Sequence, residues 1–468
     1  MIIKDFIDLI SPYVKEVRVK DKDSHLAGIV DYFQEITALD AFYLRTIQSD
    51  RPFHHLEKLK TEPRLIITHR DSDKLKSFNN VVILDKEIEE AEYLPLIANQ
   101  FYKRDETQKI IGVTGTNGKS SIVHFLNQIA TASDKQSASI GTLGLWNGNI
   151  ELRKDVYNSS PSYLFMRKIF HENSNLEYFF TELTSHALEQ KRFLDIRLDG
   201  AIWTNLTQDH LDFHKTFENY FHAKMKISNY LKEKAKLFVL ETEESLLEMI
   251  NQKSFKKLNV VKKEAYKEVL DSVPRFKVGF MRKNMALSLA LLDELNIYDP
   301  NDSTLLQKIE APKGRLEELT HQNLKVVIDY AHTPDALQKL LEEMKLMYPE
   351  KKIHTLFGCG GDRDKTKREI MGEIASSHSD MITVTSDNPR TEDPGAIIND
   401  IAKGIDNPNL KMEPDRRKAI EESVKTLNDT SILVIAGKGH EDYQEINGVK
   451  KDFSDHEVVK KAFDAFSN

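Results

Sequence analysis

The stretch KIIGVTGTNGKS, residues 109–120, joins a short apolar run to a glycine-rich turn that ends in lysine and serine. The run from Lys109 to Val113 predicts a buried strand, and residues Ser120 to Ala130 predict an amphipathic helix directly after the turn. At such a strand-to-helix turn, backbone N–H groups and the helix dipole can bind a triphosphate. The stretch therefore predicts a nucleotide-binding loop within an α/β fold.

The loop differs from the strict Walker pattern, because the first glycine of that pattern would fall on Val113. A chance Gly-x-x-Gly-Lys-Ser turn is the alternative, and the strand and helix expected on either side disfavour it. Lys119 is expected to neutralise the β- and γ-phosphates, and Ser120 to offer its hydroxyl to Mg²⁺. We expect ATP and Mg²⁺ to bind here, in a phosphate loop of a variant kind.

Apolar strands alternate with amphipathic helices along the rest of the chain. The expected strands include residues 109–113, 178–180, 200–203, 325–329, 353–357, 381–384 and 432–435. Strands followed repeatedly by helices predict parallel sheets covered on both faces, in which ligands bind at the carboxyl ends of the strands. The alternation restarts near residue 312, so we expect three domains, at residues 1–104, 105–311 and 312–468.

Length, charge and cysteine content narrow the class of protein. A chain of 468 residues is too long for a single core, and its formal net charge of −8 argues against a nucleic-acid partner. The single cysteine, Cys359, excludes an intramolecular disulfide and fits a reducing compartment. The first residues lack the apolar core of a signal peptide, and no apolar run is long enough to span a bilayer. We therefore expect a cytoplasmic protein.

Two further segments are rich in side chains that bind metal ions: TELTSHALEQKR at residues 181–192 and WTNLTQDHLDFH at residues 203–214. His210 and His214 lie four residues apart and could share one helix face, which raises a zinc hydrolase as an alternative. Glu182, together with the phosphate loop, favours Mg²⁺ held by oxygen ligands instead. A helix cap or a satisfied core group is the other interpretation of each histidine, and it is stronger for His214.

Eight segments, in order from residue 110 onward, resemble the Mur ligases, and within them the MurE type that adds the third residue of the peptidoglycan stem. They cover about three-quarters of the chain. The matching segments are residues 115–120, 182–192, 204–214 with Ala223-Lys224, 314–317, 329–335, 358–364, 387–390 and 437–441.

The resemblance implies a three-domain architecture with a central P-loop-type parallel-sheet ATPase domain and a C-terminal Rossmann-like domain. It implies an ATP-dependent amide ligase of peptidoglycan synthesis. Such an enzyme adds meso-diaminopimelate to UDP-N-acetylmuramoyl-L-alanyl-D-glutamate through an acyl phosphate. The expected partners are these small-molecule substrates, without nucleic acid or membrane, and a monomer is expected.

The resemblance also assigns roles to single residues. The expected catalytic residues are Lys119, Glu182, His210 and Lys224. One Mg²⁺ is expected on Ser120 and Glu182, and a second on His210 and a carbamylated Lys224; an ordinary surface lysine is the alternative for Lys224. The expected ATP contacts are Gly115, Thr116, Asn117, Gly118, Lys119, Ser120, Asn284, Arg315 and Asp329. The expected precursor contacts are Asn158, Ser159, Ser160, Thr184, Gln190 and Arg192. The expected diaminopimelate contacts are Arg363, Asp387, Asn388, Pro389, Arg390, Gly437 and Glu441.

The segment Asp387-Asn388-Pro389-Arg390 bears on which amino acid is added. In the family this form accompanies meso-diaminopimelate, and members that add lysine replace the arginine. Diaminopimelate carries a second carboxylate that a guanidinium can bind through two hydrogen bonds, whereas lysine would leave Arg390 unpaired. Leaving such a group unpaired costs on the order of 3 kcal/mol, or roughly a hundredfold against lysine. A structural salt bridge is the alternative role for Arg390.

The resemblance weakens in the first hundred residues. The uridine-binding signature of the family is missing, and VRVKDKDS at residues 17–24 stands in its place. Four alternatives therefore accompany the main hypothesis: a MurE-like paralogue that uses a modified precursor or another amino acid, a nucleotide-binding pseudoenzyme, an amide ligase with a folyl or polyglutamate substrate, and the zinc hydrolase.

Overall fold

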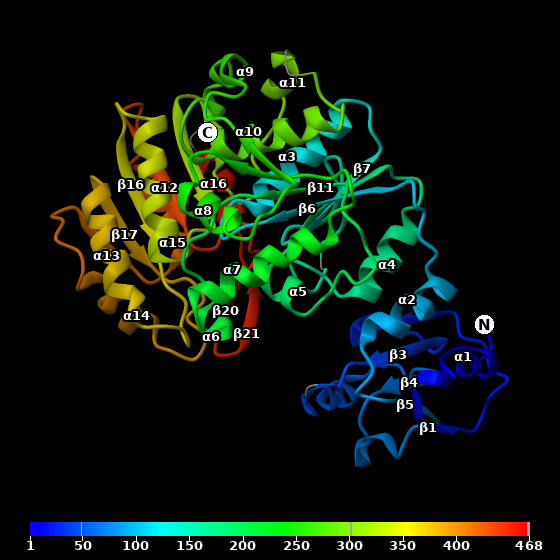
Figure 1. Ribbon diagram of the computed structural model, residues 1–468. Helices are drawn as coiled ribbons and strands as arrows, with labels where there is room; N and C mark the ends of the chain where they lie inside the picture. Colours follow the sequence, from blue (N-terminus) through cyan, green and yellow to red (C-terminus); the bar gives the residue numbers. More distant parts are fainter. Residues whose placement is uncertain (48, 155, 300–301, 466–468) are drawn as a thin grey trace. The chain divides into compact units, whose positions relative to one another are not determined.

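An eight-stranded sheet carries the phosphate loop in the computed structural model, which describes residues 1–47, 49–154, 156–299 and 302–465 (Figure 1). Its strand order is β13-β12-β11-β6-β10-β7-β8-β9, parallel from β13 to β7 and antiparallel beyond. The strands are β6 (Lys109–Thr114), β7 (Ser137–Gly141), β8 (Gly144–Asn147), β9 (Ile150–Arg153), β10 (Tyr178–Glu182), β11 (Gly200–Trp203), β12 (Leu237–Leu240) and β13 (Leu258–Val261).

The helices of this middle part of the chain follow strands, as the alternating pattern predicts. The helix after β6 begins at Lys119 and ends at Ala132, two residues beyond its predicted end. The helices are α3 (Lys119–Ala132), α4 (Tyr163–Glu172), α5 (Ser185–Glu189), α6 (Leu211–His214), α7 (Phe217–Met225), α8 (Glu244–Asn251), α9 (Lys267–Asp271), α10 (Gly279–Glu294) and α11 (Ser303–Gln307).

A five-stranded sheet occupies the N-terminal residues, with the order β1-β5-β4-β3-β2. Only the edge strand β1 runs antiparallel among its described pairings. The elements are α1 (Ile3–Ile10), β1 (Val14–Val19), β2 (Gly28–Val30), β3 (Asp40–Leu44), β4 (Leu65–Thr68), β5 (Asn80–Leu84) and α2 (Glu90–Phe101).

A six-stranded sheet organises the C-terminal residues, with the order β14-β15-β19-β16-β17-β18. The strands β15, β19, β16, β17 and β18 are parallel to one another. The edge strand β14 runs antiparallel to β15. The strands are β14 (Glu317–His321), β15 (Leu324–Asp329), β16 (Lys352–Phe357), β17 (Met381–Thr385), β18 (Leu410–Glu413) and β19 (Ser431–Ala436), with a hairpin of β20 (Tyr443–Ile446) and β21 (Val449–Asp452). The helices are α12 (Pro334–Met347), α13 (Lys367–His378), α14 (Pro394–Ala402), α15 (Arg416–Lys425) and α16 (Asp455–Asp464).

The α/β class with parallel sheets is confirmed. The chain forms two compact units: Met1–Lys119 with Ala130–Lys263, and Ser120–Ile129 with Glu264–Asn468. The three-domain boundaries expected at 104/105 and 311/312 stay predictions.

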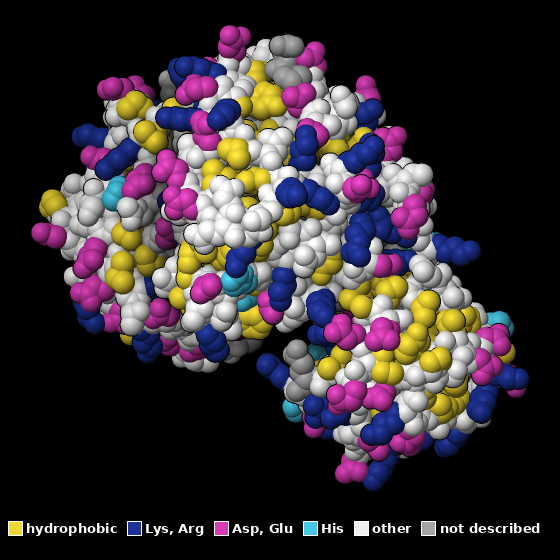
Figure 2. Space-filling model, viewed as in Figure 1, with side chains coloured by type: hydrophobic (Ala, Val, Ile, Leu, Met, Phe, Trp, Pro, Cys, Tyr) yellow, Lys and Arg dark blue, Asp and Glu magenta, His cyan; other side chains and the backbone are white. Residues whose placement is uncertain are grey.

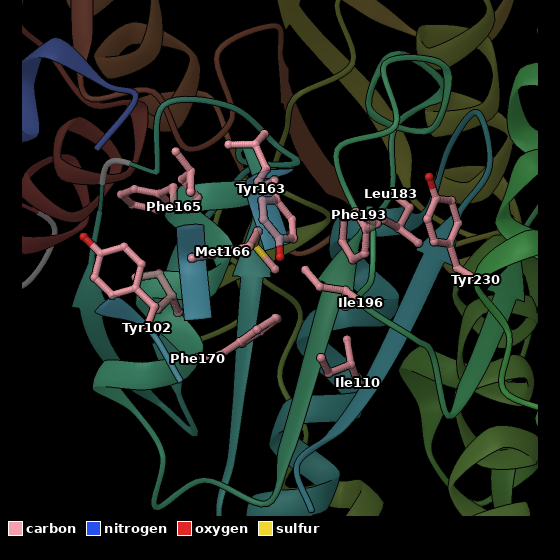
Figure 3. Packing of buried hydrophobic residues seen from close by; sticks show 14 of the residues in the cluster. Tyr102, Ile110, Tyr163, Phe165, Met166, Phe170, Leu183, Phe193, Ile196 and Tyr230 are labelled. Atoms are coloured by element: carbon pink, nitrogen blue, oxygen red, sulfur yellow. The ribbon is translucent and has the colours of Figure 1, made fainter. Parts of the chain in front are cut away.

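A buried cluster fixes the middle sheet of the first unit. Tyr163, Met166 and Phe170 of α4 lie in it together with Ile110 of β6 (Figure 3). Gly112, two residues after Ile110 in β6, lies against the Leu183 side chain. A Cβ on this glycine would overlap that side chain. Because Gly112 has no side chain, Leu183, the residue after β10, can pack directly against β6. This contact helps to fix the end of β10, where Glu182 lies, next to the end of β6, where the phosphate loop begins.

Charged side chains of both signs are interspersed over the face drawn in Figure 2. This mixture agrees with the modest net charge of −8. Within the ranges that the structure describes, we find no helix with the length and apolar character needed to cross a bilayer.

An ion pair between Arg416 and Asp455 is completely buried in the second unit, with Nη2 and Oδ2 2.7 Å apart. The guanidinium also donates to the carbonyl oxygens of Ser386, at 3.4 Å, and Ala436, at 3.2 Å. Those two residues lie at the carboxyl ends of β17 and β19, so the pair ties together the strand ends that carry the predicted amino-acid site.

Replacing Asp455 with asparagine should destabilise the fold, because it leaves the Arg416 guanidinium buried without a counter-charge. We expect the free energy of unfolding in urea to fall by about 3–5 kcal/mol. The control is Lys418→Gln, which breaks an exposed pair with Glu413 and should cost less than about 1 kcal/mol. Equal losses in the two variants would contradict this account.

Candidate active site

The phosphate loop is held open by glycine and by hydrogen bonds from the strand beside it. Gly115 has a φ of +144°, and a Cβ on it would overlap the Thr204 hydroxyl that follows β11. Thr204 Oγ1 donates to the Asn117 carbonyl at 2.6 Å, and the Asn117 N–H donates to Asn205 Oδ1 at 2.9 Å. The loop is therefore fixed by its neighbour strand in a conformation that leaves no room for a side chain at Gly115.

Two lysines meet at the first glycine of the loop. Lys119 Nζ donates to the carbonyl oxygens of Gly115 and Thr116, both at 2.9 Å. Lys224 Nζ, from α7, donates to the same Gly115 oxygen at 2.7 Å. The two side chains therefore share one acceptor at the start of the loop, where the charge of Lys119 suits the phosphates of a nucleotide.

Lys224 is buried, with 1% of its surface exposed, so the alternative of an ordinary surface lysine is wrong. Its Nζ lies 4.8 Å from the centre of the Tyr220 ring. Burial, and then the nearby charge of Lys119, hold the pKa of the Lys224 amine well below its usual value, and Asp209 opposes this only weakly. An amine in this environment is easily uncharged, which is the form that reacts with carbon dioxide.

Glu182 ends β10 and is almost fully buried. Its Oε1 accepts the Thr142 N–H at 2.7 Å, and its Oε2 lies 3.2 Å from Thr142 Oγ1. The same hydroxyl lies 2.8 Å from Ser159 Oγ. A Cβ on Gly141 would overlap the Glu182 carboxylate, so this glycine is what admits the carboxylate. Thr142 is a contact that sequence reasoning missed, because no motif marks it.

The predicted precursor residues form one hydrogen-bonded group around Glu182. Ser160 Oγ donates to the Glu182 carbonyl at 2.8 Å and accepts the Thr184 N–H at 2.9 Å. Arg192 Nη1 donates to the Ser160 carbonyl at 2.6 Å, and Gln190 Oε1 accepts from Arg192 Nε at 3.0 Å. Thr184 also caps α5. Four predicted precursor positions, one of them more than 20 residues before the other three, thus lie together.

N-terminal side chains reach this group, which the sequence did not indicate. The Tyr32 hydroxyl oxygen accepts from Asn158 Nδ2 at 3.0 Å and from the Ser162 N–H at 3.1 Å. Ser162 Oγ donates to Asp31 Oδ1 at 2.8 Å. Burial raises the pKa of the Asp31 carboxyl to about 6, and the Ser162 hydrogen bond only partly offsets it.

The two histidines of the proposed zinc pair do not share a helix face. His210 precedes α6 in a left-handed conformation with φ of +51°, and about half of its side chain is exposed. Its ring centre lies 4.9 Å from that of His186. His214 is buried, with Nε2 2.9 Å from Ser185 Oγ. Across the described ranges, no three His, Cys, Asp or Glu side chains are grouped so as to hold a metal ion by themselves.

The predicted adenosine residues lie in the second unit. Asn284 is buried within α10. The Arg315 guanidinium lies over the Tyr330 ring, 4.6 Å from its centre. Asp329 ends β15 and accepts the backbone N–H groups of Leu316 and Ala331, each at 2.8 Å, while burial raises the pKa of its carboxyl. Asp329 thus orders the backbone beside Arg315 and at the start of the loop into α12.

The predicted diaminopimelate residues gather at the ends of β17 and β19. Gly437 has a φ of +115°, and a Cβ on it would lie 2.6 Å from Asp387 Oδ2. Asn388 Nδ2 donates to Glu441 Oε2 at 2.8 Å. Lys438 is fully buried, and its Nζ lies 3.0 Å from Glu441 Oε2 and 3.1 Å from Asn388 Oδ1. Lys438 is part of a matching segment, but its place between these two side chains was not predicted.

Arg390, two residues after Asn388, adopts a left-handed backbone conformation with φ of +50°. Its Nη1 donates to the Gly361 carbonyl at 2.6 Å, and its Nε lies 3.6 Å from Glu445 Oε2. A Cβ on Gly360 would lie 2.9 Å from Arg390 Nη1 and 3.8 Å from Arg363 Cγ, so the two arginines are neighbours although Arg363 is exposed. Glu445 is a partner that the sequence did not reveal.

Comparisons with known proteins match both of the regions that contain the predicted site residues. Models of the Mur ligase middle domain and of the Mur ligase glutamate ligase domain match residues 113–298 and 314–439. A UDP-N-acetylmuramoyl-L-alanyl-D-glutamate–2,6-diaminopimelate ligase from Rickettsia bellii is 35% identical over 471 residues, covering 94% of this chain and 96% of that protein. A solved structure with the same protein name is 26% identical, covers all of both chains and has a TM-score of 0.63. The MurF ligase from Thermotoga maritima, solved with ADP, shares the fold, with 17% identity, coverage of 94% and 97%, and a TM-score of 0.60.

The chain belongs to the Mur ligase family. This confirms the family inferred from the eight matching segments, its three-domain α/β architecture and the expectation of an ATP-dependent amide ligase. The roles of the individual site residues stay predictions.

Replacing Asp31 with asparagine should change the pH dependence of stability. Because the pKa of this carboxyl is raised to about 6 on folding, the folded state holds its proton more tightly, and stability is lost as pH rises from about 4 to about 6. The variant should match the wild type near pH 4 and exceed its free energy of unfolding by roughly 1–2 kcal/mol at pH 7, a value reduced for partial exposure.

Urea unfolding at several pH values measures this difference. Asp8→Asn, at an exposed position of α1, is the matched control and should give a difference that does not grow with pH. An Asp31→Asn variant that is less stable than the wild type at pH 7 would show that the charged carboxylate stabilises the fold, contrary to this account.

Proposed function

We propose that the protein adds meso-diaminopimelate to UDP-N-acetylmuramoyl-L-alanyl-D-glutamate, consuming ATP, as a monomer that acts on small molecules. The observation that supports this most directly is the group after β17 and β19, where Asn388 is bonded to Glu441 and the Arg390 guanidinium donates to the Gly361 carbonyl. The relative from Rickettsia bellii, whose name describes this reaction, supports the choice of substrates.

The reaction requires two displacements, the first at the γ-phosphorus of ATP and the second at the carbonyl carbon of the precursor. A carboxylate oxygen of the precursor attacks the γ-phosphorus of ATP, and ADP leaves. The diaminopimelate amine then attacks the carbonyl carbon of the acyl phosphate, and inorganic phosphate leaves while the nitrogen loses a proton. Negative charge on phosphoryl oxygens dominates both steps, so correctly placed cations and N–H groups provide most of the catalysis. In this proposal Lys119, at the phosphate loop, is one of the cations that stabilise the phosphoryl oxygens.

Mg²⁺ would be held by Ser120 and Glu182, and a second ion by His210 and Lys224. The donors fit a hard cation once Lys224 carries a carbamate, because hydroxyl, carboxylate and carbamate oxygens are the ligands that Mg²⁺ prefers. Bound Mg²⁺ supplies neutralisation of the phosphate oxygens. The lowered pKa of the Lys224 amine supports carbamylation, in which the neutral amine adds carbon dioxide and releases a proton.

ATP would bind with its phosphates on residues 115–120, and with its adenosine on Asn284, Arg315 and Asp329. The precursor would bind Asn158, Ser159, Ser160, Thr184, Gln190 and Arg192. The carboxylate chemistry would then take place beside Glu182, whose carbonyl accepts the Ser160 hydroxyl and whose carboxylate accepts the Thr142 N–H.

Diaminopimelate would bind Arg363, Asp387, Asn388, Pro389, Arg390, Gly437 and Glu441. Its distal carboxylate would pair with Arg390, and its distal ammonium with Glu441. Glu445, 3.6 Å from Arg390 Nε, already neutralises part of the guanidinium charge when no substrate is bound. The distal carboxylate therefore has to compete with Glu445, and lysine has no group that can do so.

Replacing Arg390 with alanine should abolish the preference for diaminopimelate over lysine. We expect kcat/KM for diaminopimelate to fall by roughly a hundredfold, because a charge-assisted pair worth on the order of 3 kcal/mol is lost. The measurement is phosphate release with each amino acid in parallel. Arg417→Ala, at an exposed position of α15, is the control and should keep the wild-type preference.

Normal use of diaminopimelate by the Arg390→Ala variant would contradict the role of this residue. A wild-type protein that prefers lysine would contradict the assigned amino acid. ATP binding without turnover over either amine would indicate a pseudoenzyme or a different acid substrate.

Removing dissolved carbon dioxide should lower ligase activity if Lys224 acts as a carbamate. We expect activity to fall in carbon-dioxide-free buffer and to recover on addition of bicarbonate, while Lys224→Arg stays inactive in both. Lys226→Gln, next to the site in sequence and paired with Glu189 on the surface, is the control and should respond like the wild type. Activity that is independent of carbon dioxide would refute the carbamate.

A further inference from the structure

The long helix α10 has no cap of its own at its N-terminus. Val278, the residue before it, offers no side-chain acceptor. The carboxylate of Glu343, from α12, takes that place: its Oε2 accepts the Phe280 N–H at 2.9 Å, and its Oε1 lies 3.5 Å from the Met281 N–H. Two elements that are more than 60 residues apart in sequence are thereby joined through one side chain.

Gly279 and Glu343 fit each other. Gly279 has a φ of +67°, and a Cβ on it would overlap both carboxylate oxygens of Glu343. Glycine is therefore required on both conformational and steric grounds, since other residues rarely adopt this φ and none would leave room. Only 3% of Glu343 is exposed, so water does not compete for the contact.

Stability alone does not explain a carboxyl group at this position. Burial raises the pKa of Glu343 to about 7, although the two backbone hydrogen bonds and Lys283 act to lower it. A raised pKa means that the surroundings penalise the charged form by more than the helix N-terminus favours it. An apolar side chain of similar size would avoid this penalty, but it would leave the Phe280 and Met281 N–H groups without an acceptor. What the carboxyl provides is a directional contact between α10 and α12.

One of the joined helices carries a residue assigned above to ATP, and the other begins shortly after a second such residue. Asn284 lies on α10, one turn after the capped N–H groups of Phe280 and Met281. At the other end of the contact, α12 begins at Pro334, shortly after Asp329 ends β15. A shift of α10 against α12 would therefore move Asn284 relative to Asp329 and Arg315.

We propose that Glu343 is a positioning residue for nucleotide binding, which sets the distance between Asn284 and the Asp329–Arg315 group by capping α10 from α12. The inference rests on the proposed function only in assigning those three residues to ATP. Glu343 itself touches no substrate, and its effect is transmitted through the two helices.

The test compares Glu343→Met, which keeps the volume and removes the acceptor, with Glu343→Gln, which keeps an acceptor. We expect Glu343→Met to weaken ATP binding about five- to tenfold, with an unchanged KM for the amino-acid substrate. It should also lower thermal stability, because the Phe280 and Met281 N–H groups lose their acceptor. Glu343→Gln should retain near wild-type ATP affinity. The matched control is Glu342→Met, an exposed position on the same helix, which should change neither quantity.

ATP affinity is measured directly by calorimetry on the full chain, without precursor or amino acid, so that the outcome does not depend on ligation. Wild-type ATP affinity in a stably folded Glu343→Met variant would overturn the positioning role. So would a variant that only unfolds more easily, or equal losses in the Met and Gln variants. A wild type that binds ATP but ligates nothing would contradict the proposed function alone.

Discussion

Close approach of polar side chains to glycine backbone after the carboxyl ends of parallel strands is the constraint on which the predicted site residues depend. After β6 and β11, the Thr204 hydroxyl occupies the space that a Cβ on residue 115 would fill. Only glycine fits there, and this contact fixes the phosphate loop. At β17 and β19, Gly437 faces Asp387 in the same manner. Parallel strands bring these turns to one edge of each sheet, and the glycines let polar side chains occupy the space between them. The sheets thus fix where the predicted site residues lie, and the turns after the strands carry the side chains themselves.

Buried charge is the second recurrent feature, and it follows from the first. Lys438 and Arg416 are both essentially buried. Each is held by a carboxylate, Lys438 by Glu441 and Arg416 by Asp455. Such groups are costly to bury and are of little net benefit to stability. Their value lies in a preorganised field for anionic substrates, in which no solvent has to reorient during the reaction.

Much of the fold could be predicted because its signals are local. Apolar runs such as residues 109–113 and 432–435 lie within β6 and β19, with ends displaced by one residue, and glycine-rich turns mark the strand ends. The unpredicted contacts are those made between elements. Glu445 reaches Arg390 through the β20–β21 hairpin, Tyr32 reaches Asn158, and Glu343 caps α10, each at a sequence distance that no spacing rule covers. The i, i+4 spacing of His210 and His214 was misleading because His210 adopts a left-handed backbone and stands outside the helix.

The central claim is an amide ligation driven by ATP with three substrates. Its most direct measurement is inorganic phosphate release by the purified full chain in a complete mixture of ATP, Mg²⁺, UDP-N-acetylmuramoyl-L-alanyl-D-glutamate and meso-diaminopimelate, with each omitted in turn. The account predicts steady release only in the complete mixture, together with a product whose mass equals the sum of the two joined substrates less one water. Phosphate release that persists without diaminopimelate, or none in the complete mixture, would contradict it.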